Sequence, residues 1–265
     1  MYLTQITVYP IKSMGGVRMQ QCELDDFGLK YDRRWMVVDT EGNFVTQRQN
    51  AHMCFFVVEL DEKGLEIKNR QFPGWSLHVP FQLVSERTMD VKVWSDVIKA
   101  RIVDENIDRE LSKIFEHQVH LVMMPDDAIR RVDTRYAPEG SQTAFSDGYP
   151  LLIISEESLD LLNTKLDTSV EMERFRPNLV ISGGEPHTED RKGRWKIGEA
   201  LFEGVKPCSR CVITTINRDT AEKSTEPLKT LSTYRLQRGK VMFGMNLLHK
   251  TKGTVRVGDS VEFMD

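Results

Sequence analysis

The stretch Lys206-Pro207-Cys208-Ser209-Arg210-Cys211 is followed at once by the β-branched run Val212-Ile213-Thr214-Thr215-Ile216. A Cys-x-x-Cys pair serves as a redox dithiol, as half of a zinc site, or as the carrier of one thiolate to a metal cofactor. In thioredoxin-like dithiols the motif opens a helix, whose dipole lowers the pKa of the thiol. Here the alternating, branched residues predict a strand over 212–216, so that source of thiolate activation is missing.

Short strands are expected along the rest of the chain. Alternating apolar and polar residues predict strands over 3–9, 35–38, 44–47, 57–60, 65–68, 89–94, 100–103 and 179–181. The turn 40–43 joins the strands 35–38 and 44–47 into a hairpin, and the turn 61–64 joins the strands 57–60 and 65–68 into a second one. Many short strands at this spacing are typical of barrels or sandwiches.

Helices are expected at two places. One covers 107–115, with apolar side chains on one face, and the other begins after Ser155 as N-cap and runs to about residue 166. In the second helix the stripe Leu159, Leu162 and Leu166 is expected in the core. Residues 125–150 are polar and weakly periodic, which predicts a long loop. The fold class is therefore mainly β with a few helices (α+β).

Composition limits the functional classes. The 265 residues carry a net charge of -4, which argues against a general nucleic-acid binder, because that function needs a broad basic surface. Four cysteines in a chain this long do not form a disulfide framework and fit a reducing compartment. No run approaches the roughly 18 apolar residues of a membrane span, and the N-terminus lacks a signal-peptide pattern. We therefore expect a cytoplasmic protein with no membrane partner.

The cysteines leave alternatives open. Cys208 and Cys211 could join His52 and Cys54 in a zinc site, although His-x-Cys is not a usual half-site. A redox dithiol is a second alternative. Cys22 and Cys54, standing alone, are expected as small buried apolar residues. The histidines show no metal spacing, and neither a nucleophile elbow, a Walker loop nor a dinucleotide fingerprint is found.

Cationic residues stand at the ends of predicted strands. Lys12 and Ser13 lie in a glycine-containing turn after the first strand, Arg33 precedes the second, and Arg174-Phe175-Arg176-Pro177-Asn178 precedes the strand 179–181. In a barrel, strand ends surround one mouth, where guanidinium, ammonium and hydroxyl groups together bind phosphate. The alternative is that these are solvated charges, or local ion pairs with Asp32 and Glu173.

Taken together, these motifs resemble those of MOSC-domain proteins. The pattern consists of Tyr9-Pro10-Ile11-Lys12-Ser13, Asp32-Arg33-Arg34-Trp35, Arg174-Phe175-Arg176-Pro177-Asn178, Pro207-Cys208-Ser209-Arg210-Cys211 and Val257-Gly258-Asp259, in this order. It spans essentially the whole chain and is most similar to the branch containing the mitochondrial amidoxime-reducing component and its bacterial relatives. The resemblance implies an N-terminal β region over 1–120 and a MOSC β-barrel domain over 121–265, with residues 1–33 completing the barrel.

The resemblance also implies a molybdenum cofactor (Mo-molybdopterin) and residues that bind it. Cys211 would be the metal ligand and, with Asp147, a catalytic residue, whereas Cys208 would be structural. The residues implied to contact the cofactor are Lys12, Ser13, Arg33, Ser146, Asp147, Arg176, Asn178, Ser209, Arg210 and Cys211. A soft thiolate suits such a metal, and metal binding itself deprotonates a thiol, so no helix dipole is needed.

The implied function is the reduction of amidoximes, hydroxylamines or N-hydroxylated nucleobases. Electrons would come from a separate protein that is ferredoxin-like, a flavoprotein or a b-type cytochrome. With no cysteine after Cys211, we expect no iron–sulfur cluster and no fused ferredoxin domain in this chain. The alternative is a cofactor carrier or sulfur-handling protein that uses Cys211 without reductase turnover. A pyridoxal-phosphate role finds no support, because no lysine stands in a context that demands a Schiff base.

Overall fold

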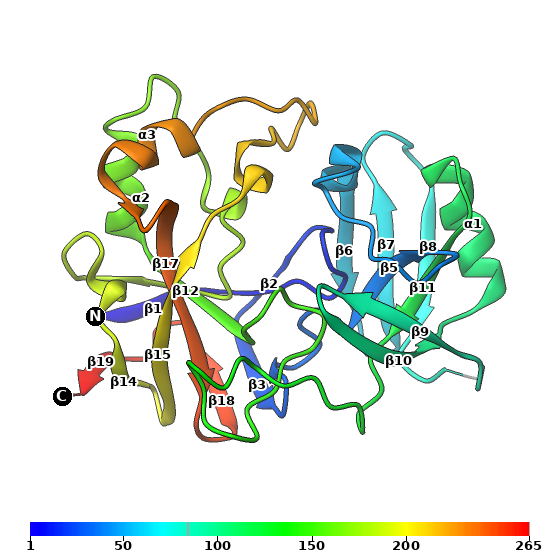
Figure 1. Cartoon of the computed structure of the whole chain (residues 1–265), viewed down its shortest axis with the longest axis horizontal. Helices are drawn as coiled ribbons and strands as arrows, with labels where there is room; N and C mark the ends of the chain where they lie inside the picture. The colour runs from blue at the N-terminus through cyan, green and yellow to red at the C-terminus, as the bar shows by residue number, and fades with distance from the viewer. Residues whose placement is uncertain (84, 265) are drawn as a thin grey trace.

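The computed structural model describes residues 1–83 and 85–264 (Figure 1). The α-helices are α1 (Glu105–Phe115), α2 (Glu156–Asn163) and α3 (Leu228–Tyr234), and the 3-10 helices are η1 (Ala51–Phe55), η2 (Met172–Arg174), η3 (Thr188–Asp190) and η4 (Val212–Thr215). The strands are β1 (Tyr2–Val8), β2 (Val17–Met19), β3 (Gln21–Asp25), β4 (Gly28–Leu29), β5 (Trp35–Asp39), β6 (Phe56–Leu60), β7 (Gly64–Asn69), β8 (Ser76–Pro80), β9 (Thr88–Val93), β10 (Asp96–Ile102), β11 (Val119–Met123), β12 (Leu151–Ser155), β13 (Leu179–Ser182), β14 (Gly193–Ile197), β15 (Ala200–Ser209), β16 (Leu236–Gln237), β17 (Lys240–His249), β18 (Gly253–Arg256) and β19 (Val261–Met264).

The largest sheet is built from both ends of the chain. Its strands follow the order β19-β14-β15-β17-β12-β13-β1-β2, with β16 paired to β17. β1 runs antiparallel to β13 and brings Ile6 opposite Leu179, whereas β12 and β13 are parallel. The Leu3 amide also donates to the Asp259 carbonyl at 2.9 Å, which joins β1 to the segment before β19. This arrangement carries the residues that follow β1 to the same end of the sheet as those that precede β13.

Three smaller sheets complete the fold. Their orders are β5-β11-β10-β9, β6-β7-β8 and β18-β3-β4. In Figure 1 the first two lie with α1 on the right, and the nine-stranded sheet with α2 and α3 lies on the left. Buried apolar residues of the strands form separate cores on the two sides. The mainly β fold with a few helices is thus confirmed, while the division near residue 120 and full closure of a barrel remain predictions.

Several predicted elements are present. The predicted hairpin over 57–68 is β6–β7, the predicted strands 89–94 and 100–103 fall in the paired strands β9 and β10, and the first predicted helix is α1. The Ser155 hydroxyl accepts a hydrogen bond from the Ser158 amide at 3.2 Å and caps α2 as expected. This helix ends at Asn163, three residues early, because the Lys165 amide bonds to the Leu162 carbonyl and tightens the last turn. Cys22 and Cys54 are buried as predicted.

Two predicted strands are wrong. Residues 212–215 of the predicted strand 212–216 form the 3-10 turn η4, in which the Thr214 and Thr215 hydroxyls donate to the carbonyls three residues earlier, at 3.0 and 2.8 Å. These side-chain bonds replace the strand pairing that the β-branched pattern favours. Over 44–47 a single bridge joins Phe44 to Val38, and the chain then turns, because the Gln49 and Asn50 amides both donate to the Thr46 carbonyl.

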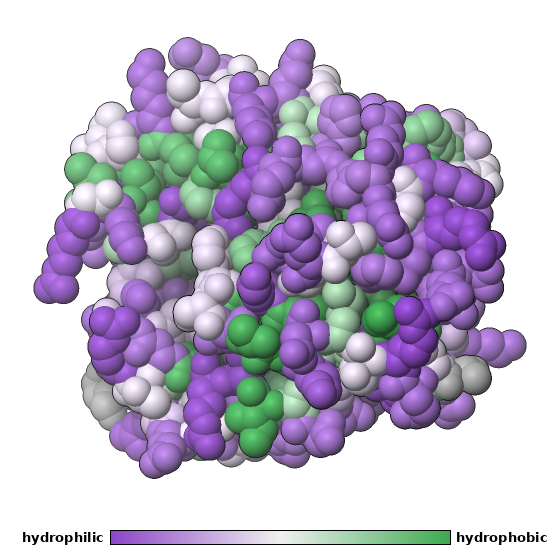
Figure 2. Space-filling view, turned by 45° about the vertical axis from the view of Figure 1, so that its right-hand side comes forward, coloured by the Kyte–Doolittle hydropathy of each residue, from purple (hydrophilic) through white to green (hydrophobic). Residues whose placement is uncertain are grey.

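One face of the molecule is largely polar (Figure 2). On the face drawn in Figure 2, hydrophilic residues predominate and apolar residues appear in separated areas among them. Across residues 1–83 and 85–264, the structure contains no helix whose length and apolar character would let it cross a membrane.

Candidate functional site

One concave site, the Cys211 pocket, brings together every residue predicted to contact a cofactor. The predicted residues come from five segments: the turn after β1, the residue pair before β5, the loop before β12, the segment between η2 and β13, and the end of β15. The predicted residues that line it are Lys12, Ser13, Arg33, Ser146, Asp147, Arg176, Asn178, Ser209, Arg210 and Cys211. Residues up to 199 positions apart in the sequence therefore meet in one pocket.

The end of β15 places the two cysteines differently. The register of β15 on β17 shifts between Pro207 and Ser209, and such irregularities re-aim the side chains beyond them. Cys208 packs against the apolar cluster that contains Phe175 and accepts a hydrogen bond from Arg210 Nη1 at 3.0 Å. Cys211, half-buried, begins η4 and lines the pocket. A single 3-10 turn is too short to supply the dipole of a thioredoxin-type helix. The conclusion that this motif lacks helix-dipole activation of a thiol therefore holds for the turn as it did for the predicted strand.

Asp147 links two cations on one side of the pocket. Its two carboxylate oxygens accept from Lys12 Nζ at 2.6 Å and from Arg48 Nη2 at 2.9 Å. Burial alone would raise the pKa of Asp147, but the charges of Lys12 and Arg48 hold this pKa well below its usual range. Burial lowers the pKa of Lys12, and the ion pair partly opposes this. Asp147 is therefore an ionised acceptor at neutral pH.

Arg48 was not found from the sequence. It comes from the turn that was predicted as a strand, stacks over the exposed ring of Trp94 at 4.8 Å, and lines the Cys211 pocket. Burial would lower the pKa of Arg48, but nearby Asp147 and then Cys211 raise it. The guanidinium thus faces both a carboxylate and the thiol. No spacing in the sequence signals this residue, because a local turn brings it to the site.

Asp32 organises a second group of pocket residues. This buried carboxylate accepts from the Tyr9 amide at 2.8 Å, from Arg33 Nη1 at 2.6 Å and from Asn178 Nδ2 at 2.9 Å. The Asn178 amide also bonds to the Thr7 carbonyl, and its oxygen accepts from Arg33. The expected local ion pair with Asp32 is therefore present for Arg33. Asn178 is engaged on both sides by protein groups and holds Arg33 in place.

Three of the predicted residues have left-handed backbone conformations. The φ angles of Ser13, Arg33 and Arg176 are 68°, 49° and 55°. For a residue with a Cβ this conformation costs about 1–2 kcal/mol. Such strain persists where the surrounding structure over-determines it, and it clusters at functional sites. Here it falls in three of the five segments that meet at the pocket.

The pocket wall contains donors without protein partners. Within the described residues, the buried atoms Arg176 Nη2 and Arg210 Nε have no hydrogen-bond partner. Buried donors are normally satisfied, so these atoms fit a wall that receives an anionic ligand. The donor set of guanidinium groups, an ammonium and one soft thiol fits a phosphate-bearing metal cofactor. Among the same residues, no group of three or more histidine, cysteine or acidic side chains is placed to bind a metal, which removes the zinc alternative.

Comparison with known proteins identifies the family of the chain. Residues 1–118 match the MOSC N-terminal beta barrel domain and residues 140–262 match the MOSC domain. The chain is 32% identical to mitochondrial amidoxime reducing component 2 of Rattus norvegicus and 31% identical to mitochondrial amidoxime-reducing component 1 of Homo sapiens, over 98% of this chain and 82% of each relative. It is also 32% identical to the molybdenum cofactor sulfurase of Arabidopsis thaliana, over 98% of this chain but 35% of that protein. The chain therefore belongs to the MOSC-domain family.

Proposed function

We propose that this protein is a molybdenum-cofactor-dependent oxidoreductase that reduces N-hydroxylated compounds. The observation that carries the proposal is the convergence of ten widely separated residues on one pocket around the Cys211 thiol. Two relatives that match nearly the whole chain are named as amidoxime-reducing components, which supports this reaction class. Amidoximes, hydroxylamines and N-hydroxylated nucleobases are the substrates we expect.

The pocket residues fall into groups by what they would do for the cofactor. Cys211 would ligate the metal, since a soft thiolate suits it and ligation displaces the thiol proton. Lys12, Arg33 and Arg176 would bind the anionic part, with polar groups of Ser13, Ser146, Ser209 and Arg210 around the pterin. Asn178 would act by holding Arg33 in place. When bound, the cofactor supplies the two-electron redox chemistry, and the protein positions it.

The roles of Asp147 and Arg48 follow from their ion pair. Because two cations lower the pKa of Asp147, its carboxylate carries no proton to donate near neutral pH. We therefore assign Asp147 an orienting role: it holds Lys12 against the pocket floor and Arg48 beside Cys211. The guanidinium of Arg48, in turn, stabilises negative charge on the Cys211 sulfur by electrostatic attraction.

Two further parts of the proposal concern partners and organisation. A separate redox protein, which is ferredoxin-like, a flavoprotein or a b-type cytochrome, would return electrons after each turnover. We also propose a boundary near residue 120, between an N-terminal β region and a MOSC domain that residues 1–33 complete; the pairing of β1 and β2 with the nine-stranded sheet supports the second point. The cytoplasmic location stays a prediction.

A second function is favoured by one comparison. Similarity to a protein named molybdenum cofactor sulfurase supports a carrier or sulfur-handling role for Cys211. Metal analysis of the purified protein, combined with reduction of benzamidoxime by an artificial electron donor, separates the two functions. Molybdenum at about one per chain together with reduction supports the reductase. Molybdenum without reduction of any N-hydroxylated compound tested supports the carrier, and zinc in place of molybdenum contradicts both.

A further inference from the structure

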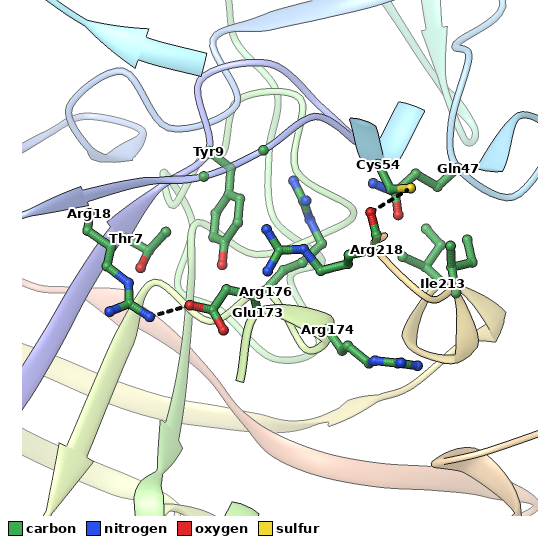
Figure 3. Close-up of a pocket in the computed structure, with 13 residues that line it drawn as sticks. Thr7, Tyr9, Arg18, Gln47, Cys54, Glu173, Arg174, Arg176, Ile213 and Arg218 are labelled. Carbon is green, nitrogen blue, oxygen red and sulfur yellow. Dashed lines mark hydrogen bonds and ion pairs between the residues drawn. The ribbon is translucent and has the colours of Figure 1, made fainter. Parts of the chain in front are cut away.

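A second hollow adjoins the Cys211 pocket. We call it the Tyr9 cavity; it is lined by Thr7, Tyr9, Gly15, Gly16, Arg18, Gln47, Cys54, Glu173, Arg174, Arg176, Ile213, Ile216 and Arg218 (Figure 3). Three of these residues, Arg174, Arg176 and Ile213, also line the Cys211 pocket. The two hollows therefore lie on either side of a shared wall.

Tyr9 presents an unused hydroxyl to this cavity. Two guanidinium groups lie against its ring, that of Arg33 at 4.4 Å and that of Arg176 at 4.2 Å from the ring centroid. The residue is 2% exposed, and within the described residues its hydroxyl has no hydrogen-bond partner. Figure 3 shows this hydroxyl pointing into the cavity. Burial raises the pKa of Tyr9, so its hydroxyl stays protonated at neutral pH and can donate a hydrogen bond to a ligand.

The cavity wall carries excess positive charge. Four arginines and one glutamate line it, a net charge of +3. Glu173 is already paired with Arg18. Arg218 contacts an exposed carboxylate at 3.3 Å, and one nitrogen of Arg176 lacks a partner. Burial lowers the pKa of Arg176 to about 10, so it remains charged at neutral pH but gains from a counter-charge.

Donors that approach from several directions, around an excess of positive charge, match the geometry of a phosphate group. The Cys54 sulfur is no competing ligand, because its thiol is directed to the carbonyls of Asn217 and Arg218. We propose that the Tyr9 cavity binds a phosphate group carried by the substrate whose N-hydroxyl enters the Cys211 pocket. This inference rests on the proposed reductase function, and it names phosphorylated N-hydroxylated compounds, such as nucleotides, as the preferred class.

A matched pair of substrates tests the proposal on the cofactor-loaded protein. N6-hydroxyadenosine 5′-monophosphate and N6-hydroxyadenosine differ by the phosphate alone. Arg218→Ala is expected to raise KM for the monophosphate about 10-fold or more and to leave KM for the nucleoside unchanged, since a charge-assisted bond is lost. Arg109→Ala removes an equal charge from exposed α1 and should change neither. An equal KM change for both compounds, or none, overturns the proposal.

A binding measurement separates this inference from the reductase function. Calorimetric titration of the cofactor-loaded protein with inorganic phosphate should show a site that Arg218→Ala weakens about 10-fold and Arg109→Ala does not. Absence of phosphate binding overturns the inference, whatever the activity. Phosphate binding without reduction of either compound keeps the phosphate site and overturns its assignment to a reductase substrate. A nucleotide in the extracted cofactor that is lost in Arg218→Ala would assign the phosphate to the cofactor instead.

Discussion

The Cys211 pocket and the Tyr9 cavity share a wall, yet their positive charges are balanced by the protein to different degrees. In the pocket, Lys12 and Arg48 meet the carboxylate of Asp147, and Arg33 meets that of Asp32. In the cavity, the hydroxyl of Tyr9 and one nitrogen of Arg176 have no partner among the described residues. Several cations of the pocket are thus held by the protein's own anions, although within the described residues Arg210 Nε and the shared Arg176 nitrogen have no partner there either. The cavity has fewer internal counter-charges and also holds the unpartnered hydroxyl of Tyr9.

The largest expected effect comes from replacing, one at a time, a cysteine of each hollow by alanine. Cys211→Ala should remove molybdenum and all reductase activity, because it deletes the proposed metal ligand. Cys54→Ala, in the wall of the Tyr9 cavity, should retain both, since the Cys54 thiol faces backbone carbonyls. Metal analysis and benzamidoxime reduction on both variants provide the comparison. Full metal content in Cys211→Ala would contradict ligation by this residue.

The next effect concerns the carboxylate behind both hollows. Asp32 binds the Tyr9 amide and the Arg33 guanidinium, and the side chain of Arg33 is 13% exposed. Asp32→Asn leaves that guanidinium without its charge partner, which should lower the free energy of unfolding by about 3 kcal/mol. Urea denaturation measures the loss. The control is Asp133→Asn, at an exposed pair with Arg135, which should show no measurable change in the free energy of unfolding. If Asp32→Asn lowers the free energy of unfolding no more than Asp133→Asn does, the Asp32–Arg33 pair is screened by solvent and the prediction is wrong.

The motifs in the sequence pointed to the residues of the pocket and not to those of the cavity. Lys12, Ser13, Arg33, Arg176 and Asn178 lie at the ends of strands that period-two alternation predicts. Ser146, Asp147, Ser209 and Arg210 were implied by the family resemblance alone. Arg48 and Arg218 lie in short turns whose shape depends on side-chain and backbone hydrogen bonds, such as those of Thr46 and Asn217. The η4 error has the same origin, because Thr214 and Thr215 satisfy their own turn instead of a neighbouring strand. Local alternation carries no information on these competing bonds.

A smaller effect tests the counter-charge in the pocket. Asp147→Asn separates Lys12 and Arg48 from their shared carboxylate, which is 55% exposed and so partly screened by solvent. We expect a loss of about 1–2 kcal/mol in the free energy of unfolding. Asp126→Asn, in the pair of a 95% exposed carboxylate with Arg34, serves as control and should have little effect.

The pH dependence of the Asp147 effect has a definite sign. The pKa of Asp147 in the folded protein lies below its usual value of about 3.9, so its contribution is fully present above that value and is lost as the pH falls through the lower folded pKa. The difference between wild type and Asp147→Asn should be constant above about pH 5 and shrink only in acid. Urea titrations from pH 3 to pH 8 measure it. A difference that disappears near neutral pH would refute the ion pair.

The smallest effect distinguishes the two hollows most directly. Tyr9→Phe removes a buried hydroxyl without a partner, so in phosphate-free buffer the free energy of unfolding should be unchanged or higher by up to about 1 kcal/mol. Phosphate at a hundred times its Kd should stabilise the wild type by about 2.7 kcal/mol and Tyr9→Phe by less, which reverses the order of the two proteins. Thermal unfolding with and without phosphate measures both. If Tyr9→Phe is destabilising without phosphate, the hydroxyl already has a partner, and the cavity is pre-organised in the same way as the Cys211 pocket.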